Sequence, residues 1–181
     1  MKTTGMTVGV MGIVCLVLAV RLAAQTDTAE SGKTRVGTYD SRAIAIAYVG
    51  TQTFAKSLAS LRAESEKAKT AGDQKRGAEM EAQAIEWQKL LHKQGFGTAP
   101  VDDILAKIKD QMPEIMMAAR VSVIVSKWDK DAMARYKSAE KVDVTSALVD
   151  ALHPDEKARK GAAEVQKQEP ISLKEAENVK D

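Results

Sequence analysis

The apolar residues of this chain form a nearly unbroken run near the beginning and recur at regular intervals afterwards. The run extends from Met6 to Val20, follows the basic residue Lys2 and precedes Ala23-Ala24. This order is typical of a secretory signal peptide and predicts removal of residues 1–24. An uncleaved N-terminal anchor is the alternative, although roughly 15 apolar residues are fewer than the ~20 that span a bilayer. Under either interpretation the rest of the chain is exported, and residues 25–34 form a flexible linker.

Two segments have the composition of strands. Arg35–Asp40 alternates apolar and polar residues, and Val121–Ser126 is rich in β-branched residues, so we expect a short strand in each. Arg135–Lys137 is a possible partner strand. The intervening Ser41–Val49 could extend the first strand, but its alanine content and an Asp40-Ser41 cap favour a helix.

The next part of the chain carries two narrow apolar stripes separated by a break at Thr70–Asp73. Their spacing of three and four residues is that of one face of a helix. The first stripe contains Ala47, Thr51, Phe54, Leu58, Leu61, Ser65 and Ala68, and the second contains Met80, Ala84, Trp87 and Leu91. Each stripe can be buried against the other, so the pattern predicts an antiparallel helical hairpin with its tip near Gly72.

Further helices are expected after the loop Gly95–Pro100. Val101–Ala119 has the most regular helical periodicity in the chain, and Pro113 should kink or restart that helix. The helical arm is therefore expected over about residues 50–119. Val142–Thr145 leads into a short helix at Ser146–Leu152, which His153-Pro154 ends.

The last segment, residues 154–181, has no sustained apolar face and is expected to be a polar tail that is disordered or weakly helical. The predicted fold class is accordingly α+β and mostly helical. A helical hairpin arm projects from a small β body, and both belong to one domain over residues 35–153.

The charge and cysteine content limit the partners of this domain. The chain has 27 basic and 25 acidic residues, and removal of Lys2 and Arg21 with the signal would leave 25 of each. A neutral domain has no net attraction for nucleic acid or anionic lipid, so membrane contact is expected only through an uncleaved N-terminal segment. Cys15 is the only cysteine and lies inside the apolar run, so the exported part has no thiol for a disulfide or a metal.

No pattern of catalytic residues is found, and we expect no enzyme, no cofactor and no metal site. His92 and His153 are the only histidines, and they are far apart in the sequence. We expect His92 to be exposed or to cap a helix, and His153 to mark a helix end. Asp129-Lys130-Asp131 lacks the further oxygen ligands and the glycine of a calcium loop. Methionine surfaces can adapt to varied partners, but the spacing of Met112, Met116 and Met117 favours a buried core instead.

The order of these motifs resembles the OmpH/Skp family of periplasmic chaperones. The resemblance covers Arg35 to Leu152 and rests on the opening strand Arg-Val-Gly-Thr-Tyr-Asp, the charged hairpin tip at Lys69–Arg76 and the segment Val142–Val149. It implies a location in the periplasm of a Gram-negative bacterium and a homo-oligomer, namely a trimer with a shared β body. It also implies that the arms shield unfolded outer-membrane proteins without ATP.

The resemblance also implies roles for particular side chains. The residues expected in the body are Val36, Val123, Val125, Val144 and Leu148. The residues expected to contact a client on the arm are Phe54, Leu58, Met80, Trp87 and Leu91. The predicted function is therefore that of an ATP-independent holdase for unfolded envelope proteins. The interruption at Gly95–Pro100 and the neutral charge favour the alternative, a non-catalytic structural or adaptor protein of the envelope that binds one folded partner.

Overall fold

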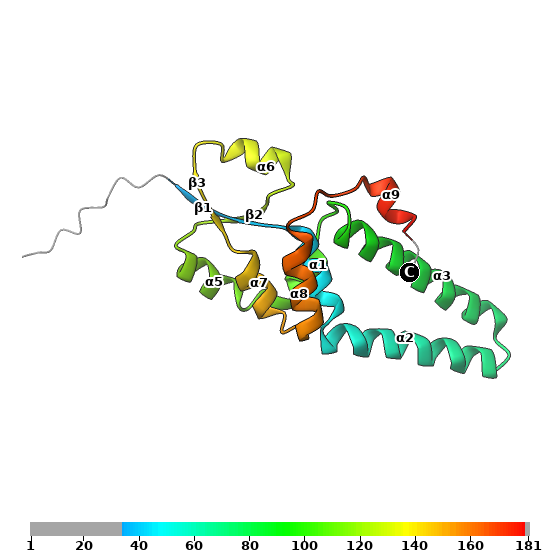
Figure 1. Cartoon of the computed structure of the whole chain (residues 1–181). Coiled ribbons are helices and arrows are strands. Elements are labelled where there is room, and N and C mark those ends of the chain that lie inside the picture. Colours follow the sequence, from blue (N-terminus) through cyan, green and yellow to red (C-terminus); the bar gives the residue numbers. More distant parts are fainter. Residues whose placement is uncertain (1–33, 180–181) are drawn as a thin grey trace, which may run out of the picture. The chain divides into compact units, whose positions relative to one another are not determined.

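The computed structural model describes residues 34–179. The predicted signal peptide, Cys15 and the predicted linker up to residue 33 lie outside the described residues. The described part is mostly helical and contains one small parallel sheet (Figure 1). The strands are β1 (Arg35–Tyr39), β2 (Ile124–Ser126) and β3 (Glu140–Asp143). The helices are α1 (Ser41–Val49), α2 (Gln52–Thr70), α3 (Gln74–Gly95), α4 (Asp102–Leu105), the 3-10 helix η1 (Ala106–Ile108), α5 (Met112–Ala119), α6 (Lys130–Arg135), α7 (Thr145–Ala151), α8 (Glu156–Val165) and α9 (Leu173–Glu177).

The sheet joins distant parts of the sequence, as predicted. Its strand order is β2-β1-β3, and Gly37 of β1 is paired with Ile124 on one side and with Val142 on the other. A Cβ at Gly37 would lie 2.9 Å from the Ile124 side chain, so the close approach of these strands requires glycine. The sheet thus brings together two segments that are more than 80 residues from the central strand.

The predicted partner strand at Arg135–Lys137 is wrong. Lys130–Arg135 forms α6, because the side chain of Asp129 accepts hydrogen bonds from the backbone N–H groups of Asp131 and Ala132 and caps a helix there. Figure 1 shows α6 on the side of the sheet opposite to α5 and α7. The third strand begins later, at Glu140.

Helix α1 is the centre of the core. Asp40 caps it, and seven of its nine residues are buried. Gly50, which follows α1, allows α8 to approach closely, because a Cβ at this position would lie 2.2 Å from the Cβ of Ala158. The buried cluster around α1 contains Tyr39, Ala43, Ile44, Ala45, Ala47, Tyr48, Val101, Ile104, Ile108, Ile115, Val144, Leu148, Val149, Leu152, Ala162 and Val165.

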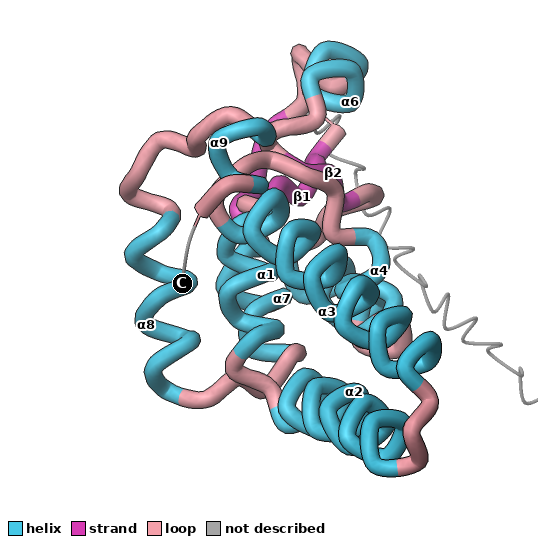
Figure 2. The backbone as a smooth tube through the Cα atoms, turned by 90° about the vertical axis from the view of Figure 1, so that its right-hand side faces the viewer, coloured by secondary structure: helices cyan, strands magenta, loops and turns pink. Residues whose placement is uncertain are grey.

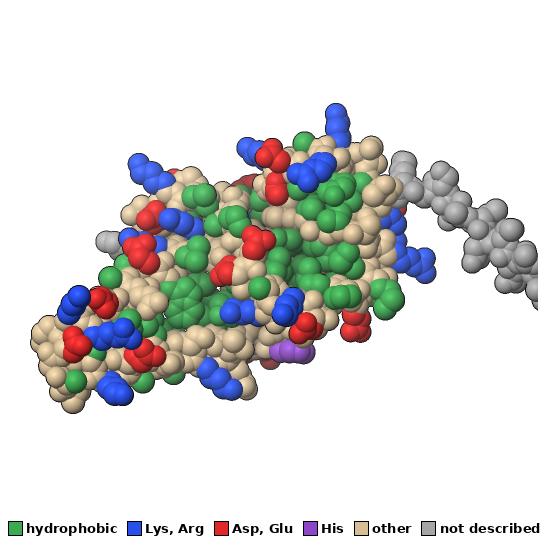
Figure 3. Space-filling model, turned by 180° about the vertical axis from the view of Figure 1, so that it is seen from behind, with side chains coloured by type: hydrophobic (Ala, Val, Ile, Leu, Met, Phe, Trp, Pro, Cys, Tyr) green, Lys and Arg blue, Asp and Glu red, His purple; other side chains and the backbone are tan. Residues whose placement is uncertain are grey.

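Helices α2 and α3 form the predicted hairpin. Thr51 caps α2, Asp73 caps α3, and the tip residue Gly72 has a φ of 74°, in the left-handed region that favours glycine. In Figures 1 and 2 the two helices meet at this tip and diverge toward α1. The face seen in Figure 3 carries many of its charged side chains along the hairpin, whereas hydrophobic side chains gather over the rest of the unit.

The predicted arm is too long at its C-terminal end. Residues 102–119 do not extend the hairpin, because Ile104, Ile108 and Ile115 are buried in the core beside α1. Pro113 lies in the first turn of α5, where a missing backbone N–H costs nothing. Of the two predictions for this proline, a kink or a restart of the helix, the restart is therefore the one observed. The expected burial of the methionines is wrong for Met117, whose side chain is 74% exposed.

Of the two alternatives for residues 154–181, disorder is wrong for the part up to residue 179 that the structure describes. Asp155 caps α8, and Ala162 and Val165 of this helix belong to the core cluster. Ser172 and Glu175 form a reciprocal capping box at the start of α9. The stripe that α8 buries is narrow and made of small residues, so its apolar signal in the sequence was weak.

Candidate functional site: an apolar cleft

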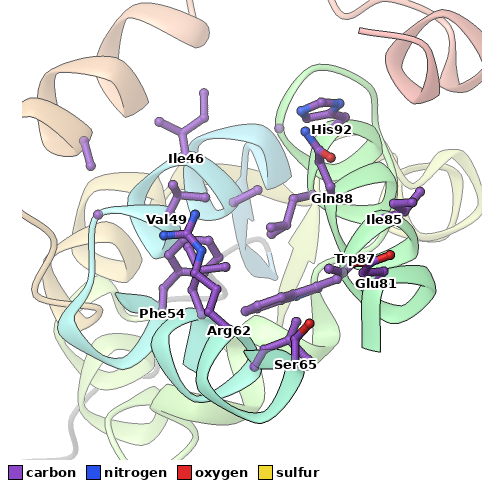
Figure 4. A pocket seen from close by; sticks show the side chains of 18 of the residues that line it. Ile46, Val49, Phe54, Arg62, Ser65, Glu81, Ile85, Trp87, Gln88 and His92 are labelled. Carbon is purple, nitrogen blue, oxygen red and sulfur yellow. The ribbon is translucent and has the colours of Figure 1, made fainter. Parts of the chain in front are cut away.

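The hairpin, α1 and α8 enclose a cleft with a volume of about 910 Å³, which we call the hairpin cleft (Figure 4). Its lining residues are Ala45, Ile46, Val49, Gly50, Phe54, Leu58, Leu61, Arg62, Ser65, Glu66, Lys69, Met80, Glu81, Ala84, Ile85, Trp87, Gln88, Leu91, His92, Gly95, Phe96, Asp155, Lys157, Ala158 and Gly161. A second, shallower hollow shares Leu61 and Trp87 with this lining. Side chains of the hairpin therefore fill part of the gap between α2 and α3 without closing it.

All five residues that were predicted to contact a client line the hairpin cleft. Phe54 and Leu91 also pack against the core cluster, and Met80 is buried near the tip. Leu58 and Trp87 are half-buried on α2 and α3. The structure thus brings together in one surface five residues that were chosen from helical spacing and family resemblance. Their contact with a client stays a prediction.

Three aromatic rings connect α1, α2 and α3, and two of them, Phe54 and Trp87, line the cleft. The ring centroids of Tyr48 on α1 and Phe54 on α2 are 5.5 Å apart in an edge-to-face arrangement. The centroids of Phe54 and Trp87 on α3 are 5.2 Å apart, and Figure 4 shows Trp87 reaching from α3 toward α2. These contacts hold the wide end of the hairpin against α1 at a fixed separation.

The narrow end of the cleft is closed by an ion-pair cluster. Lys69 on α2 approaches Glu81 on α3 to 2.9 Å and Glu66 on its own helix to 3.7 Å. The hydrogen bond and charge of Glu81, followed by the charge of Glu66, raise the pKa of Lys69. Glu66 and Glu81, the two acids that line this end of the cleft, therefore share the charge of Lys69.

The cations farther from the tip are unpaired. Arg62 on α2 and Lys157 on α8 line the cleft and make no ion pair with any residue between 34 and 179. Figure 4 shows the Arg62 side chain extending from α2 toward Val49. The nearby acid Asp155 accepts a hydrogen bond from the N–H of Ala158, as the cap of α8. This part of the cleft therefore holds two cations without an ion pair among the described residues and one carboxylate that is engaged as a helix cap.

Several lining residues were not singled out from the sequence. Val49 is 46% exposed and Ile85 is 52% exposed, so both present apolar surface to solvent. Ile85 falls between the positions of the second stripe, and α8 lies in the segment that was expected to be disordered or weakly helical. His92, expected to be exposed or to cap a helix, is buried and lies 5.7 Å from Phe96 between ring centroids. It lies in the last turn of α3, the helix that packs against α9.

A second polar cluster lies where the parallel strands end, which is where ligands bind in many open α/β sheets. Asp40 accepts hydrogen bonds from Arg42 and from the indole N–H of Trp128, and Lys127 lies 2.9 Å from its Oδ2. Burial alone would raise the pKa of Asp40, but these bonds outweigh burial and lower it to about 2. The groups satisfy one another, so we assign this cluster a structural role.

Within residues 34–179 no group of three or more histidine, cysteine or acidic side chains is arranged to hold a metal ion. None of the helices in this same part combines the length and the hydropathy needed to cross a bilayer. Comparison with known proteins gives no match to a family model, to a curated protein or to a solved structure.

Proposed function

We propose that the chain is an exported, non-enzymatic protein that binds apolar segments of other envelope proteins in the hairpin cleft. It acts as a holdase without ATP, in the manner that its resemblance to the OmpH/Skp family implies. The observation that carries this proposal is the convergence of Phe54, Leu58, Met80, Trp87 and Leu91 on one open cleft of about 910 Å³. A cleft of this volume that is lined mainly by apolar side chains is a common form of binding site.

The test uses side chains that are exposed and whose replacement leaves the core intact. A Val49→Glu/Ile85→Glu variant places two charges on the cleft wall, whereas Met117→Glu places one on α5, which does not line the cleft. We expect the wild type and Met117→Glu to suppress aggregation of a urea-unfolded outer-membrane protein on dilution, and the cleft variant to lose that suppression. Equal suppression by the cleft variant would contradict the proposal. Failure of the wild type combined with a stoichiometric complex with one folded envelope protein would favour the adaptor function.

A homo-oligomer is part of the proposal. Among the described strands β1 alone has two neighbours, so β2 and β3 each leave one edge unpaired in the chain described here. Unpaired strand edges are surfaces to which further strands can add. We expect size-exclusion chromatography with light scattering to give a mass above one chain, and a trimer in particular. A monomer at micromolar concentration would refute this part alone.

A further inference from the structure

The walls of the hairpin cleft restrict the conformation of any bound segment. All lining residues belong to α1, α2, α3 and α8 except Gly50, Phe96 and Asp155. In each of these three the backbone N–H donates and the carbonyl accepts: Gly50 bonds to Ala47 and Asp155, Phe96 to His92 and Ile171, and Asp155 to Gly50 and Arg159. None of the described strands β1, β2 and β3 borders the cleft.

An extended segment would therefore bury its own backbone groups in the cleft without partners. Each such group would lose its hydrogen bonds to water without replacement, whereas a helix satisfies its backbone internally and exposes only side chains. The α2 wall is 19 residues long, which corresponds to about 28 Å of helix. A helix of four to five turns can lie along it.

The charges of the cleft further restrict that helix. Glu66 and Glu81 are held by Lys69, and Asp155 caps α8, whereas Arg62 and Lys157 have no acidic partner among the described residues. Arg62 is exposed in the open cleft, and a carboxylate on the bound helix would form a charge-assisted hydrogen bond with it once the helix covers it. A helix without an acid at that position would leave Arg62 unpaired and partly desolvated.

We propose that the occupant of the hairpin cleft is an amphipathic helix of a partner protein that buries its apolar face against Phe54, Leu58 and Trp87 and presents an acidic side chain to Arg62. This inference rests on the proposed function and specifies its ligand. It differs from general client binding because it requires both a helical conformation and a carboxylate. The partner helix completes a three-helix arrangement with α2 and α3.

The test titrates the purified protein with three synthetic 18-residue peptides. The first is an amphipathic helix with a leucine face flanked by glutamates, and the second replaces those glutamates with glutamine. The third has the residues of the first in a different order and two prolines at its centre, which prevent it from forming a helix. Binding is followed by calorimetry and by the fluorescence of Trp87 in a Trp128→Phe background. We expect the acidic helix to bind about five- to tenfold more tightly than the glutamine peptide, and the proline peptide not to bind.

The charge pairing is tested on the protein side with a matched control. Arg62→Gln should weaken the acidic helix about five- to tenfold and leave the glutamine peptide unchanged. Lys56→Gln removes a cation on α2 that does not line the cleft, and it should change neither affinity. Arg62→Glu should reverse the preference in favour of a lysine-bearing helix.

Equal affinity for the acidic and glutamine peptides, or binding of the proline peptide as tightly as the acidic helix, would overturn the inference. It would also be overturned if dodecanoate at equal concentration displaced the bound peptide, or if a second copy of the protein displaced it as the protein self-associates. The proposed function is judged separately by aggregation suppression. Suppression that Val49→Glu/Ile85→Glu abolishes, together with no peptide selectivity, leaves the proposed function standing and removes the helical ligand.

Discussion

Asp40 and Arg42 form an ion pair in which both side chains are 1% exposed, with 2.8 Å between Oδ2 and Nη2. The same guanidinium donates to the carbonyl oxygen of Gln168 and lies 4.9 Å from the ring centre of Trp128. The pair therefore joins the end of β1 and the start of α1 to the segment after β2 and to the segment between α8 and α9. Removing one partner of a buried pair leaves the other charge uncompensated.

The first prediction concerns this carboxylate. Asp40→Asn retains a side-chain oxygen that can cap α1 but leaves Arg42 without its counter-charge, so we expect a loss of about 3–5 kcal/mol in the free energy of unfolding at pH 7. Urea unfolding measures the change. Asp155→Asn is the control, because Asp155 also caps a helix but is exposed and has no buried cation; it should cost less than about 1 kcal/mol. Equal losses in the two variants would contradict the assignment.

The second prediction is a pH dependence from the same group. The pKa of Asp40 is about 2 in the folded protein against 3.8 for an unperturbed carboxyl. Because the folded pKa is the lower one, the stabilisation of about 2 kcal/mol is complete above about pH 5 and is lost as the pH falls toward 2. The stability difference between the wild type and Asp40→Asn should narrow by about 1 kcal/mol between pH 6 and pH 3. A stability difference between the two proteins that stays constant between pH 6 and pH 3 would contradict the lowered pKa of Asp40.

The third prediction concerns the aromatic contact between Phe54 and Trp87. Each side chain is half-buried, so we expect alanine substitutions to cost about 2 kcal/mol each, below the range for fully buried aromatics. A double-mutant cycle from urea unfolding should give a coupling of about 0.5–1.5 kcal/mol. The control pair combines Phe54→Ala with Met117→Ala, whose effects should add. A coupling free energy near zero between Phe54 and Trp87 would show that the two rings are not in contact in solution.

The fourth prediction compares two glycines. A Cβ at Gly50 would overlap that of Ala158 in α8, so Gly50→Ala should destabilise the protein by about 1–3 kcal/mol. Gly77, inside α3, has only the flexible Lys69 side chain nearby at 3.5 Å. Gly77→Ala should therefore stabilise the protein by about 0.5–1 kcal/mol through helix propensity. Thermal unfolding of both variants gives the signs, and destabilisation by both would contradict the assigned environments.

Local signals in the sequence predicted the elements that depend on neighbouring residues. The cap at Asp40, the break at Gly72 and the spacing of Phe54 and Leu58 are local features, and β1, α1 and the hairpin follow them. The pairing of β1 with β2 was also expected. The third strand was predicted too early in the sequence, at Arg135–Lys137, because its apolar pattern is short and Asp129 was not recognised as a helix cap.

The candidate site was predictable only in part for a related reason. The apolar residues of α2 and α3 show a helical period, and their convergence follows from a hairpin. The contribution of α8 depends on Gly50 and Gly161, whose missing side chains let that helix approach α1, and a small-residue contact leaves no apolar stripe in the sequence. Whether Arg62 is paired depends on three-dimensional neighbours, so the free charge could not be inferred from the sequence.

The last prediction tests whether residues 156–165 form a packed helix rather than the disordered tail that their composition suggested. Ala162 is 1% exposed in the core cluster, whereas its neighbour Ala163 is exposed on the same helix. Aspartate at position 162 would bury a charge without a partner, so Ala162→Asp should cost about 3 kcal/mol or more and lower the Tm by roughly 10 °C. Ala163→Asp has the same helix propensity change and should shift the Tm by no more than about 2 °C. Because a disordered segment would tolerate both substitutions equally, indistinguishable melting curves for the two variants would remove α8 from the fold and with it one wall of the hairpin cleft.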